Sequence, residues 1–133
     1  MIQSLKNYNI TVIDNMKVSY GGIEIIGLSD NQTIKEKRAR LAQLLDPNAL
    51  SIAMVHRPSL WANIRQKPNI MLCGHTHNGQ IFPFNLIVKI KFPHVYGFFK
   101  KGNTDLYVSS GSGCWGPRMR LGSNNEIVIL EFI

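Results

Sequence analysis

The sequence predicts an α/β fold built around a mixed β-sheet, and three observations lead to this class. Two continuous apolar runs of strand length, residues 49–56 and 68–74, are typical of strands buried on both faces. The segment 58–66 between them has the length of one short helix, so we expect the two strands to be parallel. An amphipathic helical pattern over residues 33–47 precedes the first run.

The elements before the first apolar run follow from local signals. Residues 10–14 and 22–27 are predicted to be strands, and the segment between them ends in a Gly-Gly turn. Thr33 followed by Glu36 is a capping-box pattern that begins the helix, and Pro47 ends it. The apolar residues of the helix share roughly one face, and its basic residues are expected on the solvated faces. The apolar set is Ile34, Leu41, Leu44 and Leu45, and the basic set is Lys35, Lys37, Arg38 and Arg40.

The pattern changes after the second apolar run. Residues 80–103 are apolar, aromatic and basic, and prolines interrupt them. We expect a strand and a loop over the core here, with a bilayer-binding surface as the alternative. Residues 105–113 and 125–133 are predicted to be strands, joined by a glycine-rich loop. No linker composition interrupts the chain, so residues 1–133 are expected to form one domain.

The charge balance favours anionic partners. Lysine and arginine outnumber aspartate and glutamate by 15 to 8, which gives a formal net charge of +7. Nucleic acid, phosphorylated metabolites and anionic lipids fit such a surface, and general solubility is the alternative role of the charge. Cys73 and Cys114 show neither metal-ligand spacing nor a disulfide framework, which predicts a reducing, cytoplasmic location. The start of the sequence lacks a signal-peptide pattern, and no apolar run is long enough to cross a membrane.

Three histidines are the strongest functional signal. His56 follows the first apolar run, and His75 and His77 follow the second, so all three are expected at the carboxyl edge of the sheet. Imidazole is a good ligand for Zn, Mn, Fe and Ni. In an extended segment, His75 and His77 would point to opposite sides and could serve two ions, or one ion and a substrate. Ordinary surface or core histidines are the alternative, but three at one edge are hard to explain as packing.

The residues around these histidines resemble a known family. "MVHRP" (54–58) and "IMLCGHTHNGQI" (70–81) are similar to the last two signature motifs of the calcineurin-like metallophosphoesterases, and residues 96–130 resemble the closing pattern of a bacterial, membrane-associated branch. The resemblance implies the C-terminal half of a four-layer α/β/β/α sandwich and metal-dependent phosphoester hydrolysis. It also implies a dinuclear centre of Mn, Fe, Zn or Ni. His56 and His75 would ligate one metal and His77 the other.

Half of the family's site is absent from this sequence. The motifs Asp-x-His, Gly-Asp-x-x-Asp/Glu and Gly-Asn-His-Asp/Glu do not occur, so the resemblance implies that the sequence begins after the third motif. No catalytic residue would then lie in this chain, because the general-acid histidine belongs to the missing half. Without a bridging carboxylate, three neutral imidazoles would bind at most one ion. The alternatives to an active enzyme are therefore an inactive truncated fragment and a half-domain that needs a complementing N-terminal half.

The remaining predictions concern the substrate and the partners. In the loop "SSGSGCWGPRMR", Arg118 and Arg120 could bind a phosphate, and only Arg120 matches the branch's arginine; a flexible connection with solvated arginines is the alternative. The resemblance implies a lipid-linked or nucleotide-sugar phosphodiester and peripheral contact with the inner face of the membrane. Nucleic-acid binding is the weaker alternative. Asn78 replaces the family's second glycine and should tolerate a left-handed backbone. His94 and Cys114 are expected to have structural roles.

Overall fold

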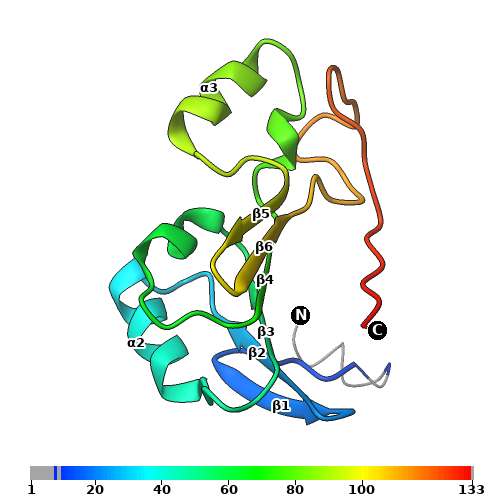
Figure 1. The fold of residues 1–133 in the computed structure, drawn as a ribbon. Helices are drawn as coiled ribbons and strands as arrows, with labels where there is room; N and C mark the ends of the chain where they lie inside the picture. The colour runs from blue at the N-terminus through cyan, green and yellow to red at the C-terminus, as the bar shows by residue number, and fades with distance from the viewer. Residues whose placement is uncertain (1–7, 9, 133) are drawn as a thin grey trace.

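The computed structural model describes residue 8 and residues 10–132, and its central feature is a mixed β-sheet (Figure 1). Within this part of the chain, six strands lie in the order β1-β2-β3-β4-β6-β5. The strands are Met16–Tyr20 (β1), Ile23–Leu28 (β2), Ser51–Val55 (β3), Ile70–Cys73 (β4), Gly97–Lys101 (β5) and Thr104–Val108 (β6). β2, β3, β4 and β6 run parallel, while β1 and β5 are antiparallel at the two edges. The predicted α/β class is confirmed, as is the parallel pairing of the two apolar runs.

The helix α2, Ile34–Leu44, begins at the predicted capping box. The Glu36 N–H donates to the Thr33 hydroxyl at 3.3 Å, and the Thr33 N–H donates to the Glu36 carboxylate at 2.8 Å. These two bonds satisfy donors that have no partner inside the helix. Leu41 is buried and Leu44 is half-buried on the side that faces the sheet.

One prediction for this helix is wrong, because Lys37 does not lie on the solvated face. Its side chain is only 6% exposed, and its ammonium group donates to Asp30 Oδ1 at 2.8 Å. A buried ammonium group needs an opposite charge or several acceptors, and Asp30 supplies that charge from the end of β2. The helical pattern shows which face is polar, but it does not show that a carboxylate from another element covers part of it.

The hydrophobic core lies on one face of the sheet. Ile26, Ala53, Met71 and Leu106 are neighbours across four strands, and each is 0% exposed. The short helix η1, Pro58–Asn63, connects β3 to β4 and confirms the predicted helical connection. Figure 1 shows α2 on one side of the sheet and the C-terminal segment on the other. The residues of α2 and η1 that complete the core are Leu41, Leu60 and Trp61.

The other face of the sheet is only partly covered. Met54 is 41% exposed, although its neighbours Ala53 and Val55 are buried. Gly27 lies on the same face and is in contact with the backbone of Ile13, where any larger side chain would overlap the Ile13 carbonyl. The prediction that residues 49–56 are buried on both faces is therefore wrong for Met54, because the chain before β1 covers β2 and leaves β3 open.

Two predicted strands are absent from the described residues. The chain does not pair over residues 10–14. A tight turn at Gly21 and Gly22, with φ of 57° and 81°, pairs Met16 with Gly27 instead. Residues 125–132 have no strand partner, and residue 133 lies outside the described part. Their apolar side chains stay in solvent, since Ile127 is 86% exposed, and β5 already pairs with β6 at that edge of the sheet.

The apolar and basic segment 80–103 contains a helix that the sequence did not predict. This helix, α3, spans Phe84–Lys91 and has no buried residue, while the end of the segment forms β5. The expected strand is thus confirmed only at residues 97–101, and residues 84–91 do not lie over the core. Across the residues that the structure describes, no helix is both long enough and apolar enough to traverse a bilayer.

Candidate metal centre

The candidate site lies at the edge where the parallel strands end. His56 follows β3 directly, and His75 comes two residues after the end of β4. The Gly74 N–H donates to the His56 carbonyl at 3.0 Å, which joins the ends of these two neighbouring strands. Asp30 lies two residues beyond the end of β2 at the same edge. Parallel pairing therefore brings together residues that are far apart in the sequence, as the strand pattern predicts.

His56 and His75 form a pair of adjoining imidazoles. His75 Nδ1 lies 2.9 Å from His56 Nε2, and the rings meet edge-on with their centroids 4.7 Å apart. The ring of Phe92 packs edge-on against His75 at 5.5 Å. Burial lowers the pKa of His75, and the nearby His56 and Arg57 lower it further, whereas Asp30 raises it. These effects favour the neutral imidazole, which is the form that ligates metals.

The spacing of the two nitrogens fits a shared ion. Two nitrogens bound to one ion at about 2.1 Å would lie roughly 3.0–3.4 Å apart, close to the 2.9 Å observed between His56 and His75. In the described part of the chain, no three histidine, cysteine, aspartate or glutamate side chains come together closely enough to enclose an ion. The described residues thus place two nitrogen donors side by side without a complete set of metal ligands.

Asp30 links the basic residues beside this pair, a role that was not predicted from the sequence. Its Oδ1 accepts from Lys37 at 2.8 Å, and its Oδ2 lies 3.3 Å from Arg57 Nη2. Burial raises the pKa of Asp30, but the hydrogen bond and charge of Lys37, together with Arg57 and His56, outweigh it and hold the pKa below its ordinary value. Its position just after a strand at the same edge was the signal that could have identified it.

His77 makes its contacts on the glycine-rich loop. It begins η2, His77–Gly79, and its ring nitrogen Nδ1 lies 3.5 Å from Arg120 Nη2. Gly111 lies beside the same nitrogen, because a Cβ added at Gly111 would be 3.7 Å from His77 Nδ1. Burial and the charge of Arg120 lower the pKa of His77, which favours a neutral ring here as well. His77 thus contacts a different set of residues from the His56–His75 pair.

The backbone between β4 and α3 is strained at the histidines. His75, His77, Asn78 and Gln80 have φ of 71°, 49°, 52° and 44°, in the left-handed region that non-glycine residues rarely adopt. Such strain is typical of functional sites, where the surrounding structure holds it in place. The prediction that Asn78 tolerates this conformation is confirmed. Gly79 is required for space, because a Cβ there would overlap the backbone of Asn85.

Arg120 binds backbone carbonyls around His77. Its Nη1 donates to the His77 carbonyl at 3.1 Å, and its Nη2 donates to the Ser110 and Gly113 carbonyls at 2.7 Å and 2.6 Å. The guanidinium group therefore ties the glycine-rich loop to the histidine segment. Arg118 is exposed in the same loop. Phosphate binding by either arginine stays a prediction.

Glu126 anchors the other end of the glycine-rich loop. Its carboxylate accepts from the Ser110 N–H at 2.9 Å, from the Tyr107 hydroxyl at 3.1 Å and from the Tyr96 hydroxyl at 3.0 Å. Partial burial raises the pKa of Glu126, but these hydrogen bonds outweigh it and bring the pKa below its ordinary value. The sequence alone does not reveal this role, because the partners of Glu126 lie on other elements.

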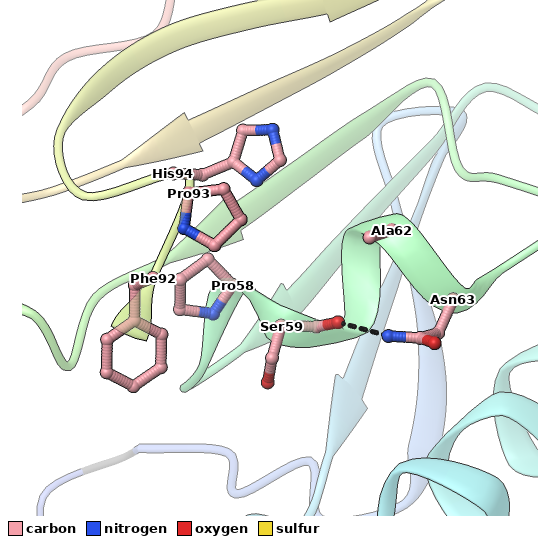
Figure 2. A pocket seen from close by; sticks show the side chains of 7 residues that line it. All are labelled: Pro58, Ser59, Ala62, Asn63, Phe92, Pro93 and His94. Atoms are coloured by element: carbon pink, nitrogen blue, oxygen red, sulfur yellow. Dashed lines mark hydrogen bonds between the residues drawn. The ribbon is translucent and has the colours of Figure 1, made fainter. Parts of the chain in front are cut away.

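His94 lies outside the candidate site. Figure 2 shows it beside Phe92 and Pro93, near the start of η1 at Pro58, where these side chains line a cavity of about 170 Å³. Its ring packs edge-on against Phe99 with the centroids 4.7 Å apart. The aromatic packing supports the structural role expected for His94.

The two cysteines do not belong to the candidate site. Cys73 is buried in the core, and burial raises the pKa of its thiol to about 12, so the thiol stays protonated at neutral pH. Cys114 is exposed in the glycine-rich loop. The buried Cys73 therefore lacks the environment of an activated nucleophile.

Comparison with known proteins gives a consistent set of relatives. The chain is 38% identical over 134 residues to an uncharacterized metallophosphoesterase of Campylobacter jejuni, covering 95% of this chain and 36% of that protein. It is 32% identical over 141 residues to an uncharacterized metallophosphoesterase of Helicobacter pylori, covering 100% of this chain and 38% of that protein. A bovine transmembrane protein with a metallophosphoesterase domain is 38% identical over 88 residues, which cover 63% of this chain and 20% of that protein.

These matches show the family of the chain and how much of its relatives the chain covers. The chain spans a little more than a third of the length of the bacterial relatives, with 36% and 38% coverage. No family model matches the chain, and no solved structure matches it either. The relatives are similar over nearly all of this chain, which includes the three histidines and the parallel strands that carry them. The chain belongs to the calcineurin-like metallophosphoesterase superfamily.

Proposed function

We propose that this chain contributes the histidine ligands of a dinuclear metal centre that hydrolyses anionic phosphoesters. The observation that carries the proposal is the pair of imidazole nitrogens 2.9 Å apart at the carboxyl edge of the parallel strands. His77 follows on the same strained segment and contacts a different set of residues. This arrangement suits two neighbouring ions better than one ion ligated by all three histidines.

Each histidine has a separate task in this proposal. His56 and His75 would hold one ion and His77 the other, with Mn, Fe, Zn or Ni as suitable metals. Bound divalent ions would supply Lewis acidity toward the phosphoryl oxygens and a water nucleophile at neutral pH. Burial lowers the pKa of His75 and His77, which favours the neutral, ligating form of both rings. Arg120 positions His77 by holding its carbonyl.

In this proposal, the bridging carboxylates come from the three family motifs that this sequence lacks. Two cations at close distance need a bridging anionic ligand to offset their repulsion, and none of the three carboxylate-bearing motifs occurs here. The chain would therefore act together with a polypeptide that carries these motifs, as a half-domain. The alternative is an inactive fragment that binds one ion weakly and hydrolyses nothing.

The substrate in this proposal is an anionic phosphoester. The net charge of +7 supports an anionic ligand. Arg118 is exposed and could contact it, while the carbonyl contacts of Arg120 support a positioning role for that residue. The resemblance to the membrane-associated branch extends the proposal to lipid-linked or nucleotide-sugar phosphodiesters.

The first test measures metal binding to the chain alone. Isothermal titration with Mn²⁺ or Zn²⁺ should show one weak site, and His75→Ala should weaken it about tenfold or more because one of two adjoining ligands is lost. His94→Ala is the matched control, since His94 packs on Phe99 away from the site. Equal binding by both variants would contradict the proposed ligands.

The second test measures hydrolysis. The chain with excess Mn²⁺ should not turn over a chromogenic phosphodiester, whereas a mixture with a polypeptide carrying the three missing motifs should. His77→Ala should abolish the activity of the mixture, and His94→Ala should retain it. If no mixture gains activity, the inactive fragment is the correct alternative. His75-dependent turnover by the chain alone would show that no complementing half is needed.

A further inference from the structure

The helix α3 is the least covered regular element in the described part of the chain. None of its eight residues is buried. Figure 1 shows it at the top of the molecule, away from α2 and from the central strands. Its contacts are with η2, and Asn85 packs directly against Gly79. An apolar helix in this position needs an explanation other than the core.

Most apolar side chains of α3 point away from the protein. Asn85 and Val88 are half-buried on the side that faces η2. At about 100° per residue, Leu86, Ile87 and Ile90 lie on the opposite side. They are 53%, 61% and 86% exposed. We call these three residues the α3 surface. Phe82 and Phe84, which are 56% and 62% exposed, extend the exposed apolar area at the start of the helix.

Positive charges flank the α3 surface on both sides. Lys89 and Lys91 lie in the last turn of the helix, and the helical angle places one on each side of the apolar residues. Between Gln80 and Thr104 the chain has four lysines and no acidic residue. This is the pattern of an interfacial helix, whose apolar side chains enter the acyl boundary while its lysines extend to anionic headgroups.

We propose that α3 docks this protein on an anionic lipid surface. The charge complementarity favours a bilayer, because an apolar strip flanked only by lysines lacks the acidic groups that pair with basic residues across protein interfaces. α3 follows η2, which begins at His77, so docking would hold the candidate metal centre close to the membrane surface. The proposal does not depend on metal binding or on hydrolysis.

The test is sedimentation of the full chain with lipid vesicles. Vesicles with two parts phosphatidylcholine to one part phosphatidylglycerol should bind the protein, and vesicles of phosphatidylcholine alone should bind it much more weakly. Ile90→Asp should reduce binding at least tenfold, because a carboxylate would enter the acyl boundary next to anionic headgroups. Lys89→Gln and Lys91→Gln should each reduce vesicle binding about fivefold, and added salt should also weaken vesicle binding.

The matched control is Ile127→Asp. Ile127 and Ile90 are both 86% exposed, so the two variants make the same chemical change at equally exposed positions. Circular dichroism should show native secondary structure for both, since neither side chain is in the core. Normal binding by Ile127→Asp with loss of binding by Ile90→Asp supports the proposal. Equal loss in both variants would show nonspecific adsorption of apolar surface and overturn it.

Two other occupants of the α3 surface have distinct outcomes. If a polypeptide carrying the missing motifs covers this surface, its addition will abolish vesicle binding, and the proposal is wrong. If a second copy of the chain covers it, Ile90→Asp will convert a dimer to a monomer in analytical ultracentrifugation, and vesicle binding will not depend on phosphatidylglycerol. Failure of the hydrolysis tests would not affect this result, because vesicle binding is measured without metal or substrate.

Discussion

Arg120 illustrates how the structural context of one residue determines the use of its charge. An arginine in a glycine-rich loop can grip a phosphate, and the sequence cannot distinguish that role from a structural one. In the structure its two terminal nitrogens donate to carbonyls of the loop and of His77. The planar fork of guanidinium suits several acceptors at fixed directions, which a lysine ammonium cannot match.

We therefore predict that Arg120→Lys destabilises the protein. Lysine keeps the charge but cannot reach carbonyls on both segments, so several acceptors would lose their donor. The free energy of unfolding in urea should fall by about 1–3 kcal/mol. Arg118→Lys is the control, because Arg118 is exposed in the same loop and should change stability little. Equal stability of the two variants would contradict the positioning role of Arg120.

At the scale of elements, local signals predicted those structures that depend on local geometry. The capping box at Thr33 and the apolar runs at β3 and β4 identified their elements, and the glycine before the histidines indicated the sheet edge. The errors at residues 10–14 and 125–132 have one cause. A strand needs a neighbouring strand to pair with, and apolar composition does not show that β1 and β5 already occupy the two edges of the sheet.

The same reasoning explains what could be predicted of the candidate site. The three histidines follow from strand order, because each ends or follows a parallel strand. Asp30 could have been found by the same reasoning, because it follows β2 at this edge. The roles of Glu126 and of the carbonyl partners of Arg120 could not be found in this way, since they arise from contacts between distant segments. α3 was missed because residues 80–103 show no buried face with a helical period.

Glu126, which anchors the glycine-rich loop, should make the free energy of unfolding sensitive to acid. Its folded-state pKa is lowered, so its contribution is complete above the pKa of glutamate in the unfolded chain and is lost as the pH falls through the folded pKa. Glu126→Gln should be less stable than the native chain near neutral pH, and should lose less stability on acidification to about pH 4. Urea unfolding at both pH values measures this.

The control for this prediction is Glu131→Gln. Glu131 is exposed near the end of the chain, so its replacement should leave the acid dependence of the native protein in place. A Glu126→Gln variant with the same acid dependence as Glu131→Gln would show that the hydrogen bonds from Ser110, Tyr96 and Tyr107 do not stabilise the ionised carboxylate.

At the scale of the whole molecule, the sheet is covered well on one face and incompletely on the other. Ile26, Ala53 and Met71 are fully buried beneath α2 and η1, whereas Met54 on the opposite face is 41% exposed. A mixed sheet with an open apolar face is typical of one layer of a larger sandwich. This agrees with a chain that spans 36–38% of the length of its bacterial relatives.

Under the half-domain proposal, a polypeptide that carries the missing motifs should stabilise this chain by mass action. A partner that binds only the folded state raises the free energy of unfolding by about 2.7 kcal/mol when its free concentration is a hundred times its dissociation constant. The melting temperature measured by calorimetry should rise with the partner's concentration, and Met54→Asp should reduce that rise because it places a carboxylate on the open face. A melting temperature that does not change with partner concentration would contradict this interpretation.

The strand order also has a kinetic consequence. The edge pairs β1–β2 and β5–β6 are hairpins with short turns, so they can close on the microsecond timescale. The central parallel pairs join segments that are distant along the chain, and closing such long loops slows folding. Because His56 and His75 meet only when β3 pairs with β4, the edge that carries these two histidines should form after the two hairpins. A probe of imidazole proximity should consequently report a slower refolding phase than a probe of either hairpin.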